Sequence, residues 1–189
     1  MRLVIASDIH GAADRCAKLM EAIEEIQPDR VALLGDLLYH GPRNDLSADY
    51  APKRVIQMLN SIAESIVAVR GNCEAEVDQM VLDFPCMATY NTLLDADARG
   101  GRGRSIFLTH GHAYGPGIHN SVDAWPALGE GDALVYGHTH KKVLLEGGDA
   151  VAGHEGVTVF NPGSVGIPKD GSASFGVYED GRFEHRRLG

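Results

Sequence analysis

Five short apolar runs, rich in β-branched residues, constrain the fold of this 189-residue chain more than any other feature. Each run is bounded by glycine or polar residues, a pattern typical of buried strands. In open α/β sheets, ligands bind beyond the carboxyl ends of the strands. The residues that follow the runs are therefore expected to meet at one edge of a sheet. The runs are residues 3–7, 31–34, 66–70, 105–109 and 133–136.

Between the first runs, the spacing of apolar residues predicts helices. Residues 15–26 carry an apolar stripe at helical spacing, and Pro52 suits the first turn of a second helix. A third helix is expected after Asn72, and its apolar residues are Val77, Met80 and Val81.

The second half of the chain is expected to be rich in strands. Residues 90–94 and 105–109 flank a Gly/Arg loop, and Asp180-Gly181 is a strong signal for a two-residue hairpin. No linker, internal repeat or low-complexity tract interrupts the pattern. Residues 1–189 are therefore predicted to form a single α/β domain.

The composition excludes some classes of function. A net charge of −9 argues against a broad basic surface for long nucleic acid, and no apolar stretch approaches the length of a membrane span. No long nucleic acid and no membrane partner are therefore expected. The clustered arginines are expected to be solvated, and they are Arg99, Arg102, Arg104, Arg182, Arg186 and Arg187.

The cysteines and the N-terminal residues both favour a cytoplasmic protein. Three cysteines are an odd number without metal-type pairing, which suits a reducing compartment. The first residues enter a predicted strand without the features of a signal peptide.

Each of the five runs is followed by residues that bind divalent metals. Carboxylates, imidazoles and one amide form a mixed oxygen and nitrogen set. Such a set suits Mn, Fe, Zn or similar ions better than the thiolate-rich ligand set of a structural zinc site does. In an extended chain, residues i and i+2 project to the same side, so Asp8 and His10 are expected to face one site, as are His138 and His140. The candidates are Asp8, His10, Asp36, Asn72, His110, His138 and His140.

The number of candidates favours two ions over one. A single ion rarely takes more than six ligands, whereas two ions sharing Asp36 would use all seven candidates. Two dications and two aspartates leave a surplus positive charge, which attracts a phosphate ester. Each motif alone is more typical of a turn, a cap or a structural histidine. The ordered series is what points to a metal centre.

The ordered motifs resemble those of calcineurin-like metallophosphoesterases, and within them the small bacterial YfcE-type phosphodiesterases. The resemblance covers nearly the whole chain and implies two facing β-sheets flanked by helices, an αββα sandwich. It also implies a dinuclear, usually Mn-dependent hydrolase, with Fe, Co, Ni or Zn as other suitable ions. The matching segments begin at Asp8, Gly35, Gly41, Gly71, Thr109, Gly137 and Asn161.

The resemblance divides the candidate ligands between two metals. Asp36 would bridge the ions, and a hydroxide bridging them would attack phosphorus opposite the leaving oxygen. The first ion would be held by Asp8, His10, Asp36 and His140. The second ion would be held by Asp36, Asn72, His110 and His138.

These roles imply hydrolysis of a small phosphodiester or nucleotide-like substrate. Phosphomonoester hydrolysis by the same site is one alternative. A non-catalytic protein-binding scaffold of the same fold is another, and the complete set of ligands argues against it. The relatives often pair, so a homo-oligomer is also expected.

Further candidates line the path of the substrate. The resemblance assigns catalytic or substrate-binding roles to Asn72, Cys73 and His112 beside Asp36. Cys73 stands where many members have a histidine that protonates the leaving group or contacts the phosphate. Its thiol either fills the space of that histidine or leaves departure of the leaving group weakly assisted. His112 is expected to touch the phosphate or to support the ligands from outside.

Neighbouring residues are expected to support the site. Glu74 either orients a ligand or caps a helix. Residues 161–164 are expected to form a supporting turn. Arg43 and Asn44 are expected on a solvated loop, with substrate contact as the alternative.

Overall fold

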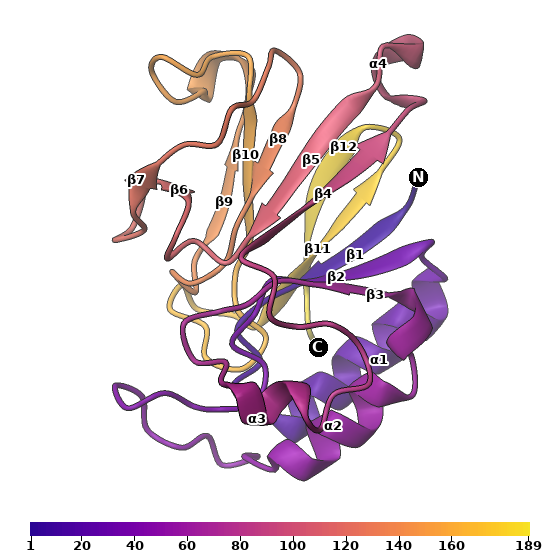
Figure 1. Ribbon diagram of the computed structural model, residues 1–189, viewed down its shortest axis with the longest axis vertical. Coiled ribbons are helices and arrows are strands. Elements are labelled where there is room, and N and C mark those ends of the chain that lie inside the picture. The colour runs from indigo at the N-terminus through magenta and orange to yellow at the C-terminus, as the bar shows by residue number, and fades with distance from the viewer.

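The computed structural model describes residues 1–189 and contains two five-stranded β-sheets that pack face to face (Figure 1). A two-stranded hairpin stands beside them. The strands are β1 (Leu3–Ala6), β2 (Arg30–Leu33), β3 (Ile66–Ala68), β4 (Tyr90–Asp95), β5 (Arg104–Thr109), β6 (Gly115–Pro116), β7 (Asp123–Ala124), β8 (Ala133–Val135), β9 (Lys142–Leu145), β10 (Thr158–Pro162), β11 (Ser174–Glu179) and β12 (Arg182–Arg187). The helices are α1 (Ala13–Ile26), α2 (Pro52–Asn60), α3 (Glu76–Gln79) and α4 (Ala98–Gly101), with 3-10 turns η1 (Ala63–Ser65) and η2 (Gly147–Asp149).

Each sheet contains a block of three parallel strands, with antiparallel strands beside it. The order in the first sheet is β12-β11-β1-β2-β3, where β1, β2 and β3 run parallel. The order in the second sheet is β4-β5-β8-β10-β9, where β5, β8 and β10 run parallel. All five predicted runs form strands of these two parallel blocks, and the predicted sandwich of two sheets is confirmed.

The period of two along β1 explains how the layers are built. Val4 points to the core shared with the helices, whereas Leu3 and Ile5 point to the core between the sheets. Helices α1 and α2 cover the outer face of the first sheet (Figure 1). The outer face of the second sheet is covered by the segment that carries Tyr114 and Trp125. No helix has the length and apolar character needed to cross a bilayer.

The third predicted helix is only one turn long, and its expected apolar stripe is not buried. Met80 is 82% exposed and Val77 is 59% exposed. After the helix, the side chain of Gln79 hydrogen-bonds the backbone of the segment that follows, at Leu82, Phe84 and Cys86. That segment supplies Leu82 and Phe84 to the core in place of the expected stripe.

Two turn-region predictions have different outcomes. The Asp180-Gly181 hairpin joins β11 to β12 as predicted, with positive φ at both residues (51° and 76°). The prediction of a solvated Arg104 is wrong. Its guanidinium donates hydrogen bonds to the carbonyl oxygens of Gly131 and Gly181. It therefore links the start of β5 to the segment before β8 and to the turn between β11 and β12.

Candidate metal centre

All seven predicted ligands lie together, but they follow strands of both sheets and not of one sheet as expected. Asp8 and His10 follow β1, and the remaining candidates follow β2, β3, β5 and β8 in turn. Asn72 is exposed and His138 is partly exposed, whereas the other five ligands are buried. The group is therefore open to solvent on the side of Asn72 and His138.

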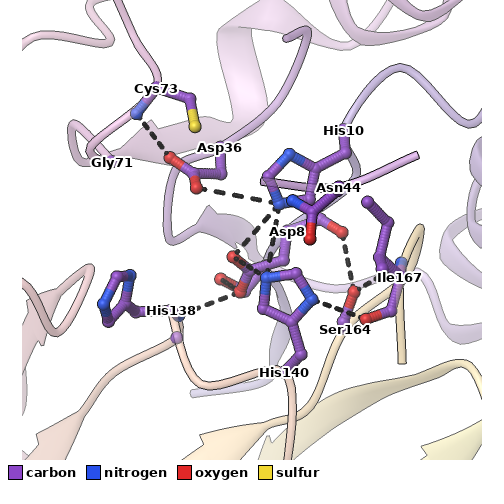
Figure 2. Close-up of polar contacts among 12 residues, drawn as sticks. Asp8, His10, Asp36, Asn44, Gly71, Cys73, His138, His140, Ser164 and Ile167 are labelled. Carbon is purple, nitrogen blue, oxygen red and sulfur yellow. Dashed lines mark hydrogen bonds and ion pairs between the residues drawn. The ribbon is translucent and has the colours of Figure 1, made fainter. Parts of the chain in front are cut away.

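The first set of donor atoms has the spacing of metal ligands. The Oδ1 atom of Asp8 lies 3.3 Å from Nε2 of His140 and 3.7 Å from Nε2 of His10. Nε2 of His10 lies 3.7 Å from Oδ2 of Asp36. Ligands held 2.0–2.2 Å from one ion lie about 2.8–3.8 Å apart at coordination angles of about 90–120°. Figure 2 shows these four side chains pointing toward one another.

An unsatisfied oxygen marks the centre of this set. Asp8 is fully buried, yet its Oδ1 accepts no hydrogen bond. Its other oxygen accepts hydrogen bonds from the Ser7 hydroxyl at 2.6 Å and the His138 backbone N–H at 3.0 Å. A buried carboxylate oxygen without a partner is costly unless a cation or donor satisfies it. The donor set therefore fits a bound metal ion.

A second set of donors lies beside the first and shares one atom with it. Oδ2 of Asp36 lies 3.5 Å from Nε2 of His110. That nitrogen lies 3.1 Å from Oδ1 of Asn72 and 3.3 Å from Nδ1 of His138. Because Oδ2 of Asp36 is also near His10, it is the atom common to both sets.

Backbone carbonyl groups orient three of the four imidazoles. In each, Nδ1 lies within hydrogen-bond distance of a carbonyl oxygen, so Nδ1 donates and Nε2 faces the centre, where it can bind a metal once it is unprotonated. Such outer contacts fix the tautomer of metal-binding histidines. The pairs are His10 with Tyr39 at 2.7 Å, His110 with Leu34 at 2.7 Å, and His140 with Ile167 at 2.5 Å.

Five of the candidate ligands have left-handed backbone conformations. Non-glycine residues with positive φ are uncommon and cluster at functional sites. The expectation that extended chain aligns Asp8 with His10 is wrong, because β1 ends at Ala6 and the ligands lie in the loop beyond it. Asp8 and His10 nevertheless share the first donor set, whereas His138 and His140, which were also expected to face one site, belong to different donor sets. The residues are Asp8 (φ 55°), His10 (49°), Asp36 (54°), His138 (66°) and His140 (58°).

The charges of the carboxylates and imidazoles are coupled. Burial favours the neutral form of Asp8, but the neighbouring histidines hold its pKa well below the usual range. Burial opposes protonation of His110, yet its hydrogen bond to Asp36 and the aspartate charges raise its pKa to about 9. Burial and the nearby His110 lower the pKa of His138 to about 4. In the metal-free protein, His110 therefore carries the proton of the second donor set.

Glu74 orients a ligand and does not cap a helix. Its carboxylate accepts hydrogen bonds from the backbone N–H groups of Asp36 at 2.8 Å, Leu37 at 2.7 Å and Gly71. The N-terminus of α3 is capped by Asp78, which accepts from the Ala75 N–H at 2.7 Å. Of the two roles predicted for Glu74, the structure supports the first.

The turn at residues 161–164 supports the site as expected. Asn161 is fully buried, and its amide donates to the Gly137 carbonyl oxygen at 2.8 Å. The Ser164 hydroxyl donates to the Asp8 carbonyl oxygen at 2.8 Å and accepts from the Ile167 N–H at 2.8 Å (Figure 2). Ser164 thus connects the loops that carry Asp8 and His140.

Cys73 and His112 both lie beside the ligand cluster. The Cys73 backbone N–H donates to Oδ1 of Asp36 at 2.9 Å. Burial, together with the charge of Asp36, raises the pKa of the Cys73 thiol above its usual range. The His112 ring lies 5.3 Å from that of His110 and 6.4 Å from that of His138, and its buried Nδ1 has no hydrogen-bond partner.

A pocket of about 200 Å³ opens onto the cluster. Cys73 lines it, whereas His112 does not. Arg43 and Asn44, predicted on a solvated loop, also line it, together with Lys169. Lys169 is the residue that the sequence reasoning missed. The sequence did carry a signal for it, because Lys169 ends the segment that begins at Asn161 and resembles the family.

Comparisons with known proteins agree with this arrangement. The family model described as the calcineurin-like phosphoesterase superfamily domain matches residues 1–180. The chain is 42% identical to the phosphodiesterase YfcE of Escherichia coli over 181 residues, which are 95% of this chain and 88% of the relative. The solved structure of the E. coli phosphoesterase YfcE superposes with a TM-score of 0.83 at 38% identity and full coverage of both chains. The phosphodiesterase MJ0936 of Methanocaldococcus jannaschii is 25% identical over 189 residues, covering 100% of this chain and 98% of that protein.

Proposed function

The chain belongs to the calcineurin-like phosphoesterase superfamily, and from this membership we propose that it is a dinuclear, metal-dependent phosphodiesterase. Its substrate is a small phosphoester. Within the proposal, Asp8, His10, Asp36 and His140 hold one ion. Asp36, Asn72, His110 and His138 hold the other.

One observation carries the proposal. Oδ2 of Asp36 lies 3.7 Å from Nε2 of His10 and 3.5 Å from Nε2 of His110, so a single carboxylate oxygen belongs to two converging donor sets. A shared ligand keeps two ions close together. Two divalent ions bound there would supply a nucleophilic hydroxide and the positive charge that stabilises the phosphoryl transition state.

The protein's own groups prepare the site for this chemistry. Asp8 and Asp36 are ionised at neutral pH because the surrounding imidazoles lower the pKa of both carboxyl groups despite their burial. His110 must release the proton that its raised pKa of about 9 retains in the metal-free protein. The exposed Asn72 and the half-buried Cys73 line the pocket, so a substrate phosphate would meet them on entry.

The finer parts of the proposal are manganese as the metal, a cytoplasmic location and self-association. The mixture of carboxylate, amide and imidazole donors supports manganese among first-row ions. Three free cysteines support a reducing compartment. The exposed side chains of Val77 and Met80 support an interface with a second copy of the chain.

The test is to remove metals with a chelator and restore Mn, Fe, Co, Ni and Zn separately. An aryl phosphodiester, a phosphomonoester and a cyclic nucleotide would be assayed beside one another. We expect diester turnover to return with Mn, and Asp36→Asn to lower kcat at least about 100-fold, since it weakens both sites. The matched control is Asp97→Asn, an exposed residue at the far end of the β4–β5 hairpin.

Two outcomes would contradict the proposal. One is the absence of metal-dependent turnover of any ester. The other is an Asp36→Asn variant as active as the wild type. Turnover of the monoester without the diester would replace phosphodiesterase by phosphomonoesterase activity.

A further inference from the structure

We propose that Arg43 and Lys169 form a binding site for a second phosphate group, so that the preferred substrate is a phosphodiester carrying an additional phosphate. This inference rests on the proposed function and names the substrate class of the same site. It starts from the two cationic side chains that line the pocket beside the ligand cluster.

The two cations reach the pocket from different sides. Lys169 is next to the first donor set, because its backbone N–H donates to the His140 carbonyl oxygen at 3.0 Å. Arg43 belongs to the loop beside Cys73, where a Cβ on Gly41 would lie 3.2 Å from the Cys73 sulfur. Both cations therefore lie beside a substrate seated on the metal cluster, and a pocket of about 200 Å³ is small enough for one group to contact both.

Neither side chain is neutralised by the protein. Arg43 and Lys169 take part in none of the ion pairs of the structure. Asp170, the sequence neighbour of Lys169, is instead engaged by Lys142 at 2.7 Å. In a chain with a net charge of −9, two unpaired cations at the mouth of the site favour an anionic ligand.

The charge count identifies how anionic that ligand is. Two dications with Asp8 and Asp36 already leave a surplus of two positive charges, enough for a phosphodiester monoanion and a hydroxide. Arg43 and Lys169 add two more. A phosphate monoester group carries close to two negative charges at neutral pH and matches them, whereas a carboxylate would match only one.

The rest of the lining excludes recognition by hydrophobic contact. Apart from Pro42 and Cys73, the pocket is lined by glycine, polar and charged residues. The loop that carries Arg43 is also held in place. The Asn44 amide donates to the His40 carbonyl oxygen at 2.7 Å. A polar, preorganised wall suits a phosphate better than an aromatic leaving group.

The test compares two esters that differ by one phosphate. Thymidine 5′-(p-nitrophenyl phosphate) and its 3′-phosphate derivative share the scissile bond and the leaving group. For the metal-loaded protein we expect the 3′-phosphate to lower KM about tenfold, the effect of one partly exposed charge-assisted contact. The advantage should shrink at high salt, because exposed charges are screened.

Charge variants assign the effect to the two residues. Arg43→Gln and Lys169→Gln should each reduce the ratio of the two KM values, and the double variant should bring it close to one. Lys53→Gln is the matched control, because Lys53 is exposed on α2 and outside the pocket. It should leave the ratio as in the wild type.

A binding measurement separates this inference from the proposed function. Titration calorimetry of the metal-loaded protein with thymidine 3′,5′-bisphosphate and thymidine 5′-phosphate does not require turnover. Equal affinities in the wild type, or a preference that the double variant retains, would overturn the inference. Absence of p-nitrophenolate release from both esters, with the bisphosphate preference intact, would overturn only the proposed function.

Discussion

The side chain of Glu74 holds the backbone of Asp36, with 2.8 Å between Oε2 of Glu74 and the backbone nitrogen of Asp36. The same carboxylate also accepts from Leu37 and Gly71, so it joins the loops after β2 and β3. Asp36 is the ligand shared by the two donor sets. A residue that is not itself a predicted metal ligand thus holds the backbone of the ligand that both sets share.

Replacement of Glu74 by glutamine is expected to weaken metal binding. The amide keeps the shape of the side chain but turns one of its acceptors into a donor, which leaves a buried backbone N–H unsatisfied. We expect metal affinity to fall about 10–100-fold and the free energy of unfolding to fall by about 1–3 kcal/mol. Metal titration calorimetry and urea unfolding measure the two effects.

The matched control is Glu76→Gln, an exposed residue in the first turn of α3. It should change neither quantity appreciably. Equal metal affinity in Glu74→Gln and the wild type would show that Glu74 does not position Asp36.

A methyl group at position 71 should disrupt the site directly. A Cβ built on Gly71 would lie 2.1 Å from Oδ1 of Asp36, far inside van der Waals contact. Gly71→Ala should therefore displace Asp36 and lower both metal affinity and the temperature of thermal unfolding. Gly148→Ala is the control, because its Cβ would meet no atom within 4 Å. If Gly71→Ala bound metals as Gly148→Ala does, the close approach at Gly71 would have no role in the site.

The thiol of Cys73 is predicted to limit assistance to the leaving group. It lines the pocket, and its raised pKa reflects burial and the charge of Asp36. Cys73→His is expected to speed hydrolysis of esters with poor leaving groups more than that of activated aryl esters, because an imidazolium can donate a proton. The dependence of log kcat on leaving-group pKa should become shallower. Cys73→Ala is the control for loss of the thiol alone, and an unchanged slope in Cys73→His would mean that Cys73 only fills space.

The raised pKa of His110 predicts that the metal-free protein loses stability as pH rises. The folded-state pKa is about 9, above the ordinary value of 6.5. A raised pKa contributes stability that is fully present below pH 6.5 and is lost as pH rises through about 9. With a chelator present, the temperature of thermal unfolding should fall between these pH values. Added Mn²⁺ should reduce the fall, because it replaces the proton on Nε2.

Two variants assign that pH effect. His110→Asn should flatten the dependence above pH 6.5. His119→Asn should keep it, because His119 is exposed and its φ of 56° is a conformation that asparagine tolerates. A pH-independent unfolding temperature in the chelated wild type would rule out the raised pKa.

Local patterns in the chain predicted the strands and the identity of the candidate ligands. Short apolar runs such as residues 31–34 form buried strands, as their composition predicts. The residues that directly follow such a strand lie at the edge of the sheet. The side chain of Asp36 therefore reaches the centre because of where β2 ends. The same logic failed for Met80, whose exposure depends on the way Gln79 binds the following segment.

The sequence by itself determined the strands, the donor residues and the chemistry that such donors support, because these follow from neighbours within a few residues. The arrangement in two sheets was implied only by the resemblance of the motifs to a known family. Only the tertiary structure decided which oxygen the two sets share, that Glu74 holds Asp36, and that Lys169 joins Arg43 at the pocket. It also decided the left-handed conformations of the ligand loops. These features arise from contacts between segments distant along the chain, and no local pattern encodes the distance between two such segments.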